Sequence, residues 1–245
     1  MQDLWELCHQ GEGPALFDMD GTLFAGDLGE TSFFVLLACE LLHKEPQTIN
    51  ASDVTLLEQS KGTGLEHILG SYSSAVRQGL MKEAYAITAD YVQTLPYAKV
   101  LSACIRCFEA FGDNSCSFLF DGVKHSLFVK KEQHMLAFLQ ACLHAKKAVF
   151  LVSASPLQVV IAFCEMFALS GITPIAADTR HELPYGPGKV ERLAQAGVLA
   201  AQLAFGNSIG DREMLQLARF GVLRNPGDDT VLRTLAQEKA WMIVD

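Results

Sequence analysis

The sequence predicts an α/β fold in which a Rossmann-like, doubly wound parallel sheet carries an inserted, mostly α-helical domain. Short, nearly continuous apolar runs bounded by Gly, Pro, Ser or Asp recur along the chain, as in strands that are buried on both faces. Amphipathic helical patterns separate the later runs, which is typical of βαβ units with right-handed crossovers. The first two runs are about 130 residues apart, which is too far for a single crossover. We therefore expect a second structural unit between them.

Five apolar runs are expected to form the sheet. They are Ala15–Met19, Ala148–Val152, Thr173–Ala177, Gln202–Gly206 and Phe220–Leu223.

Four helical patterns accompany the later runs, as the doubly wound arrangement requires. They are Gln133–Lys146, Pro156–Leu169, Gly188–Gln195 and Asp211–Ala218. For the second of these helices, Ser155 is the expected N-cap, because it precedes a proline at the first helical position.

The insert is expected to span residues 25–128, so that residues 1–24 and 129–245 form the α/β core. Its helical patterns are Glu30–Leu42, Val54–Leu69, Ser71–Gln78, Met81–Leu95 and Ala98–Phe111. The segment Asn114–Phe128 has an extended pattern with a turn signal at Asp121-Gly122, which predicts a hairpin.

Composition excludes several functional classes. Half of the 245 residues are hydrophobic and 19% are charged, so a sizeable core is expected. The net charge of −9 argues against nucleic-acid or anionic-membrane partners. No apolar run reaches the ~18 residues of a membrane span, and the N-terminus does not resemble a signal peptide. The seven cysteines are dispersed, and Cys104 and Cys107 have no second pair beside them, so we expect a reducing, cytoplasmic compartment.

Polar side chains follow the predicted strands at the points where these strands end. Asp18 and Asp20 follow the first strand, Ser153 follows the second, and Asn207 follows the fourth. Ligands of open parallel sheets bind at the carboxyl ends of the strands. The pattern therefore predicts a polar site at this edge, with two carboxylates so close together that a cation is needed to offset their repulsion.

These residues lie in four motifs that resemble those of the haloacid dehalogenase superfamily, in particular its phosphoserine-phosphatase-like branch with a helical cap. The motifs are FDMDGT (Phe17–Thr22), LVSAS (Leu151–Ser155), GPGKVERL (Gly186–Leu193) and FGNSIGDREML (Phe205–Leu215). The predicted insert has the position of the cap in that branch.

The resemblance implies a reaction through an aspartyl-phosphate. Asp18 would be the nucleophile, and Asp20 would protonate the leaving group and then activate water. Mg²⁺ would be held by Asp18, by the backbone carbonyl of Asp20 and by a side chain of the fourth motif, which is Asn207 or Asp211.

The remaining motif residues would bind phosphate. Ser153 would donate a hydrogen bond to a phosphoryl oxygen, and Lys189 would neutralise negative charge on the phosphate and on the nucleophile. Thr22 and nearby backbone amides would complete the phosphate-binding loop. The expected function is thus Mg²⁺-dependent hydrolysis of a small phosphomonoester.

One departure from the family pattern leaves alternatives open. The fourth motif usually carries an acid directly after its glycine, whereas this chain has Asn207, whose amide oxygen is an uncharged ligand. A non-catalytic or weakly active phosphate- and metal-binding protein is therefore an alternative. Phosphoryl transfer to another alcohol is a second alternative, because it uses the same nucleophile.

The substrate's leaving group is expected to contact the start of the insert, at Asp27 and Glu30. The spacing from Asp20 to Asp27 matches an acid that faces the substrate's amino group in phosphoserine-phosphatase-like relatives. An acid near aromatic residues suits an ammonium group, and Phe24, Phe33 and Phe34 lie nearby in the sequence.

Phosphoserine, phosphocholine and phosphoethanolamine are all candidate substrates. Phosphoserine would need a cation for its carboxylate, for which Arg77 and Arg106 are available in the sequence. The competing interpretation of Asp27 is that it only caps the helix that begins near Leu28.

Overall fold

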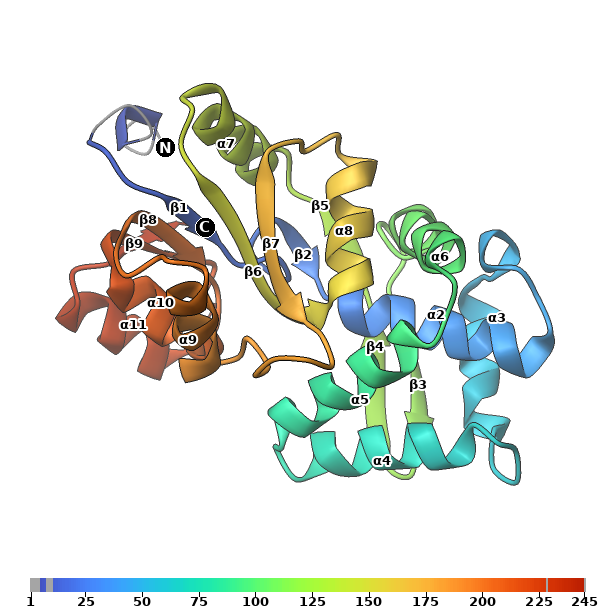
Figure 1. Cartoon of the computed structure of the whole chain (residues 1–245). Coiled ribbons are helices and arrows are strands. Elements are labelled where there is room, and N and C mark those ends of the chain that lie inside the picture. The colour runs from blue at the N-terminus through green and yellow to red at the C-terminus, as the bar shows by residue number, and fades with distance from the viewer. Residues whose placement is uncertain (1–4, 8–10, 228, 245) are drawn as a thin grey trace.

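A parallel six-stranded sheet forms the centre of the computed structural model, which describes residues 5–7, 11–227 and 229–244 (Figure 1). The strand order is β10-β9-β8-β1-β6-β7. The strands are β1 (Ala15–Phe17), β6 (Val149–Pro156), β7 (Ile172–Ala177), β8 (Ala201–Gly206), β9 (Ala218–Arg224) and β10 (Met242–Val244). All five predicted runs form strands of this sheet, and the α/β fold class is confirmed. The edge strand β10 was not predicted, because its three residues are too few to form a recognisable pattern.

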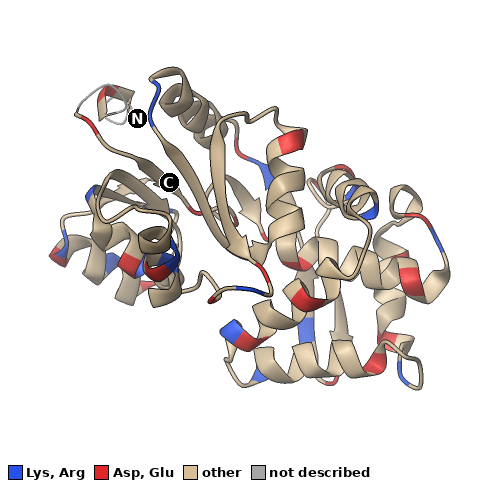
Figure 2. Cartoon of the chain, in the orientation of Figure 1, with Lys and Arg blue, Asp and Glu red and all other residues tan. Residues whose placement is uncertain are grey.

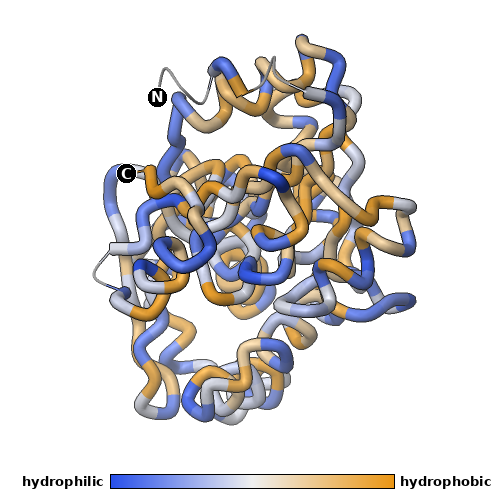
Figure 3. The backbone as a smooth tube through the Cα atoms, turned by 90° about the vertical axis from the view of Figure 1, so that its left-hand side faces the viewer, coloured by the Kyte–Doolittle hydropathy of each residue, from blue (hydrophilic) through white to orange (hydrophobic). Residues whose placement is uncertain are grey.

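Helices cover both faces of the sheet. Successive strand residues point to opposite faces, so Phe17 packs in one apolar cluster and Leu16 in another. The first cluster includes α7 (Gln133–His144) and α8 (Leu157–Met166). The second includes residues of α9 (Pro187–Gln195), α10 (Arg212–Leu217) and α11 (Thr230–Glu238). Figure 3 shows hydrophobic segments running through the middle of the molecule, as a two-layered core requires.

The central position of β1 brings three strand ends together. Phe17 is in register with Leu151 of β6 and with Phe205 of β8. The segments that follow these residues therefore leave the same edge of the sheet side by side. This register places Asp18, Ser153 and Asn207 around one point, although they are far apart in the sequence.

The inserted segment lies beside the sheet, at the lower right of Figure 1. Its helices are α2 (Leu28–Leu42), α3 (Ala51–Thr55), α4 (Glu66–Arg77), α5 (Met81–Gln93) and α6 (Tyr97–Ala110), with short 3-10 turns at Pro46–Thr48 and Leu56–Gln59. Its strands β3 (Cys116–Phe120) and β4 (Val123–Leu127) form the predicted hairpin. Asp121 and Gly122 both have positive φ, as a tight hairpin turn requires.

A two-stranded ribbon joins the insert to the sheet. The chain leaves through β2 (Phe24–Gly26) and returns through β5 (Val129–Lys131), which pairs antiparallel with β2.

Two predicted helices of the insert have wrong bounds. Val54–Leu69 is divided, because Gly62 has a φ of 79° and the chain turns between Leu56–Gln59 and α4. The predicted helix Ser71–Gln78 begins earlier, at Glu66, because it is part of α4.

The distribution of charged residues and the hydrophobicity of the helices give little further indication of function. Figure 2 shows Lys and Arg interspersed with Asp and Glu over the sheet layer and the insert. In the part of the chain that the structure describes, no helix is both long enough and apolar enough to cross a membrane. Cys39, Cys104, Cys107, Cys116 and Cys164 are free thiols, and burial raises the pKa of the Cys104 thiol to about 12.

Candidate active site

A cavity of about 270 Å³ opens at the carboxyl edge of the sheet. It is lined by residues of all four sequence motifs: Asp18, Asp20, Ser153, Lys189, Asn207 and Asp211. The sheet geometry therefore brings together six of the residues that the sequence singled out.

Lys189 is buried between two carboxylates. Its Nζ donates to Asp18 Oδ1 at 2.6 Å and to Asp211 Oδ1 at 2.6 Å, and it also donates to the backbone oxygen of Val152 at 2.9 Å. All three ammonium protons are thus engaged. Burial alone would lower the pKa of Lys189, but the charges of Asp18 and Asp211 raise it above its usual value. The side chain is a fixed positive charge beside Asp18.

Asp18 is held in one orientation from two sides. Its Oδ1 accepts from Lys189, and its Oδ2 accepts from the hydroxyl of Thr22 at 3.0 Å. Burial raises the pKa of Asp18 to about 7, with the charge of Asp211 adding to this rise and Lys189 opposing it. The carboxylate therefore lies in an environment where a further cation would stabilise its charged form.

Asp20 lies between two serines of β6 and the start of α2. Its Oδ2 accepts from Ser155 at 2.6 Å and from Ser153 at 3.2 Å, and its Oδ1 accepts from the backbone amide of Leu28 at 2.7 Å. Burial raises the pKa of Asp20, and these hydrogen bonds oppose the rise. The carboxyl group is thus placed at the junction between the sheet and the first helix of the insert.

The expected role of Ser155 as a helix cap is wrong. Ser155 lies inside β6, and Pro156 occupies the N-cap position of α8 without a side-chain hydrogen bond. The hydroxyl of Ser155 faces Asp20 instead, because β6 continues further toward the cavity than its apolar pattern indicated.

Asn207 lies where oxygen atoms converge. The side-chain amide atom that faces the motif-one loop is 3.1 Å from the carbonyl oxygen of Asp20 and 3.2 Å from Asp18 Oδ2. With its nitrogen in this position, Asn207 donates two hydrogen bonds; with its oxygen there, three acceptors converge and a cation is needed between them. Neighbouring oxygen ligands of an octahedral Mg²⁺ are about 3 Å apart, because each Mg–O distance is ~2.1 Å.

The donor set therefore fits Mg²⁺. It combines a carboxylate, a backbone carbonyl and an amide oxygen, which are ligands that Mg²⁺ accepts. Among the described residues, no group of three His, Cys, Asp or Glu side chains is placed to hold a metal ion.

Asp211 contacts Lys189 and the loop that carries Asn207. Its Oδ2 accepts from the backbone amides of Asn207 and Ser208 and from the Ser208 hydroxyl, each at 3.0 Å, and its Oδ1 accepts from Lys189. Both oxygens are thus occupied by donors. These contacts favour a positioning role for Asp211, in which it shapes the loop that carries Asn207 and orients Lys189.

Comparison with known proteins gives the family. The model of the haloacid dehalogenase-like hydrolase family matches residues 15–216, which include all four motifs. The chain belongs to the haloacid dehalogenase-like hydrolase family. The comparison with curated protein sequences found no match to this chain.

Two solved structures share the fold of this family member, and a third aligns with a lower TM-score. A conserved protein of unknown function from Anaerococcus prevotii aligns with a TM-score of 0.62 and 13% identity, over 100% of this chain and 91% of that one. A HAD family hydrolase from Salmonella enterica serovar Typhi aligns with a TM-score of 0.53 and 13% identity, over 95% and 67%. A substrate-bound phosphoserine phosphatase aligns with a TM-score of 0.49 and 15% identity, over 96% and 93%.

The cavity of this family member is also lined by one further acid, Asp27, and by two tyrosines. Asp27 lines the cavity and also caps α2, because its Oδ1 accepts from the backbone amide of Glu30 at 2.6 Å. Burial and the charges of Asp20 and Glu30 raise the pKa of Asp27 well above its usual value. Both interpretations of Asp27 from the sequence are thus compatible with its position.

Glu30 does not line the cavity. Its Oε1 accepts from the hydroxyl of Tyr72 at 2.7 Å and lies 3.9 Å from His125 Nδ1, within the insert. The geometry thus separates Glu30 from Asp27, although the sequence grouped them.

Sequence reasoning missed the aromatic residues of this site. Tyr85 of α5 and Tyr185, which precedes α9, both line the cavity, with ring centroids 5.6 Å apart. Phe24, Phe33 and Phe34, which were expected near the substrate, are fully buried in the core. Tyr85 and Tyr185 are far from motif one in the sequence, and no local pattern marks them.

Proposed function

We propose that this protein hydrolyses a small phosphomonoester with Mg²⁺ and forms an aspartyl-phosphate on Asp18. The observation that carries the proposal is the placement of Asp18, which lines the cavity between the buried Lys189 ammonium and the side-chain amide of Asn207. A carboxylate so placed is oriented for attack, and the adjacent positive charge lowers the cost of bringing a phosphate dianion to it.

Two steps account for turnover. An oxygen of Asp18 forms a bond to phosphorus while the bond to the leaving oxygen breaks, and Asp20 in its acid form gives that oxygen a proton. Asp20 then accepts a proton from a water molecule, whose oxygen attacks the phosphorus of the aspartyl-phosphate and releases Asp18 as a carboxylate. The raised pKa of Asp20 favours the protonated form that the first step requires.

The other motif residues support these steps. Lys189 stabilises negative charge on the phosphoryl oxygens and on Asp18, and Thr22 and Asp211 hold the reacting groups in place. Ser153 lines the cavity and is available to phosphate when its hydrogen bond to Asp20 is exchanged. When bound, Mg²⁺ would neutralise charge between the phosphate and the nucleophile, with Asp18, the Asp20 carbonyl and Asn207 as its protein ligands.

Asn207→Asp is expected to lower the Mg²⁺ concentration needed for half-maximal activity by about tenfold. The substitution replaces an uncharged oxygen ligand with a charged one, and hard divalent cations bind carboxylates more tightly. Calorimetric titration of the substrate-free protein with Mg²⁺ at constant ionic strength should show the same change in affinity. Unchanged metal dependence in both measurements would remove Asn207 from the metal site.

We also propose that the leaving group is a small amino alcohol. Asp27 and two tyrosine rings line the cavity. A bound ammonium group would stabilise the charged form of Asp27 that burial disfavours, and aromatic faces attract the same group. Among the described residues that line the cavity, only Lys189 is cationic, and its protons are already engaged. Arg77 and Arg106 do not line it. Phosphoethanolamine or phosphocholine therefore suits the site better than phosphoserine, whose carboxylate would lack a partner.

Asp27→Asn should reduce kcat/KM for phosphoethanolamine or phosphocholine by about 10- to 100-fold and leave hydrolysis of an aryl phosphate within about threefold. Asn keeps the helix cap and removes the charge, so only recognition of the ammonium group should change. Glu30→Gln is the matched control, because it removes an acid from the same helical turn without altering the cavity lining. Equal losses on charged and neutral substrates would contradict the amine site.

The direct test of the function is phosphate release from an aryl phosphate and from a panel of phosphorylated amines, amino acids and sugars, each with and without Mg²⁺. We expect Mg²⁺-dependent release, fastest with the amines. No release from any substrate would favour the non-catalytic alternative. Release that requires an added acceptor alcohol, with formation of a new phosphoester, would favour phosphoryl transfer.

The domain division belongs to the same proposal. Residues 25–128 are proposed to act as the cap that closes over the substrate, and residues 1–24 and 129–245 as the core that carries the reacting groups. The position of Tyr85 on α5 supports this division, because it brings a side chain of the insert to a cavity at the edge of the core sheet.

A further inference from the structure

A buried arginine at the end of β9 contacts the motif-one loop from outside the cavity. Arg224 is 6% exposed. Its Nη1 donates to the backbone oxygens of Gly21 at 3.0 Å and Thr22 at 2.9 Å, and its Nη2 lies 3.1 Å from Glu132 Oε1. The planar fork of the guanidinium thus links three points of the chain. Arg224 does not line the cavity, so it touches neither the substrate nor the metal site.

The two residues that Arg224 contacts determine the positions of two proposed active-site groups. Thr22 donates its hydroxyl to Asp18 Oδ2, so the position of its backbone affects the orientation of the nucleophile. Gly21 has a φ of 73°, and a Cβ at this position would lie 2.0 Å from the Asn207 amide. The loop therefore packs directly against Asn207, and a shift of the loop would move the convergent oxygens apart.

Through Glu132, Arg224 also contacts the two-stranded ribbon that joins the insert to the sheet. Glu132 directly follows β5, and β5 pairs with β2, which begins two residues after Thr22. Arg224 thus binds both sides of the ribbon through which the chain enters and leaves the insert. Glu132 occupies the N-cap position of α7 but makes no side-chain cap hydrogen bond, so its contact with Arg224 is separate from helix capping.

We propose that Arg224 is a positioning residue, which holds the motif-one loop so that Asp18 and the Mg²⁺ ligands keep their geometry relative to the sheet. This inference rests on the proposed function, since it assigns to Arg224 the support of that site. The charge of Arg224 is balanced by Glu132, and its two carbonyl contacts fix the loop at adjacent residues. A lysine has a single nitrogen and cannot occupy both the Nη1 and Nη2 positions.

Arg224→Lys should lower kcat by about 10- to 100-fold with a smaller change in KM, and should weaken Mg²⁺ binding to the substrate-free protein by about tenfold. Calorimetry with MgCl₂ alone measures the second effect without any need for turnover. The thermal midpoint of unfolding is recorded for each variant, so that loss of stability is separated from loss of site geometry.

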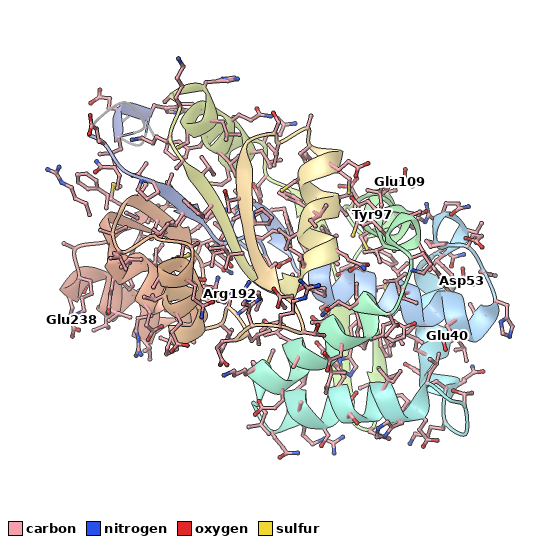
Figure 4. All side chains as sticks on the ribbon, viewed as in Figure 1. Glu40, Asp53, Tyr97, Glu109, Arg192 and Glu238 are labelled. Carbon is pink, nitrogen blue, oxygen red and sulfur yellow. The ribbon has the colours of Figure 1, made fainter. Side chains whose placement is uncertain are left out.

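Arg192→Lys is the matched control. Arg192, labelled in Figure 4, is also largely buried, and its Nη1 donates to two backbone oxygens, those of Ala176 and Glu182, while its Nη2 binds the Asp178 carboxylate. The two arginines thus have the same pattern of contacts, but Arg192 does not contact the motif-one loop. We expect Arg192→Lys to lower the unfolding midpoint to a similar extent and to leave kcat and Mg²⁺ affinity within about threefold.

A second variant covers the case in which Arg224→Lys does not fold. Glu132→Ala frees Nη2 while Nη1 keeps both carbonyl contacts, and it should reduce kcat and Mg²⁺ affinity by about three- to tenfold. If Arg224→Lys folds and matches Arg192→Lys in kcat and Mg²⁺ affinity, Arg224 is only structural and this inference is overturned. If it does not fold and Glu132→Ala leaves both quantities unchanged, the inference is overturned as well. A wild-type protein that neither binds Mg²⁺ nor releases phosphate would instead overturn the proposed function, and this inference with it.

Discussion

Asp18→Asn is expected to reduce phosphate release by at least about a thousandfold and to leave the protein folded. An amide cannot supply the attacking oxygen, so no aspartyl-phosphate forms. The fold should tolerate the change, because burial already raises the pKa of Asp18 to about 7 and a neutral side chain avoids that cost. Steady-state phosphate release and circular dichroism, measured on the same preparation, test both parts of the expectation.

Asp20→Asn serves as the comparison for this variant. It should also be severe, with a loss of about 10²- to 10⁴-fold, since both proton transfers are lost. The two variants differ in one respect, because Asp20→Asn retains the nucleophile and can still be phosphorylated by a substrate with a good leaving group. A folded Asp18→Asn protein with more than a few per cent of wild-type activity would contradict the covalent mechanism.

Lys189→Met is expected to have the largest effect on stability, with a loss of about 3–5 kcal/mol in the free energy of unfolding. The substitution leaves the buried carboxylates of Asp18 and Asp211 without their shared cation, and both accept from Lys189 at 2.6 Å in the native protein. Activity should fall to near background, because the positive charge beside the nucleophile is lost. Chemical denaturation at pH 7.5 measures the stability change.

The pH dependence of this variant has a defined sign. In the wild type, the folded-state pKa of Asp18 is about 7 and its ordinary value is 3.8, so between these pH values the folded protein retains a proton that the unfolded chain has lost. The contribution of Asp18 to stability therefore falls as pH rises through this window. Without Lys189 the window extends to pH values above 7, where the wild type no longer retains the proton, so the deficit of Lys189→Met should shrink as the pH is lowered from 9 to 7.

Lys44→Met is the control for this pH effect, since Lys44 pairs with Asp53 through a side chain that is 44% exposed. It should cost at most about 1 kcal/mol. A deficit of Lys189→Met that is equally small, or independent of pH, would show that the Lys189 contacts do not neutralise the acids as we propose.

The site residues that could be predicted from the sequence are those at the ends of the parallel strands. Asp18 and Asn207 directly follow β1 and β8, Ser153 lies near the end of β6, and strand ends meet at one edge of such a sheet. Their convergence was therefore predictable from apolar runs and motif order alone. Lys189 could be placed only through the resemblance to the family, because a single lysine near a helix start is not informative by itself.

Side chains that approach the site from distant elements could not be predicted in this way. Tyr85 and Arg224 lie on elements whose distance from motif one depends on how the insert packs and on how far the side chains reach. Tyr185 lies in an irregular segment before α9 that has no periodic pattern. For Glu30 the sequence predicted a site contact that the structure does not have. Glu30 is close to Asp27 in the sequence, but on α2 its side chain contacts Tyr72 and does not line the cavity.

The central claim is that phosphate passes through a covalent bond to Asp18. A rapid-quench experiment with substrate, followed by borohydride reduction, converts an aspartyl-phosphate to homoserine, which peptide mass spectrometry can locate. We expect homoserine in place of Asp18 in the wild-type protein and in Asp20→Asn, and none in Asp18→Asn. An active wild-type protein that gives no homoserine at this position, or gives it at another aspartate, would contradict the account.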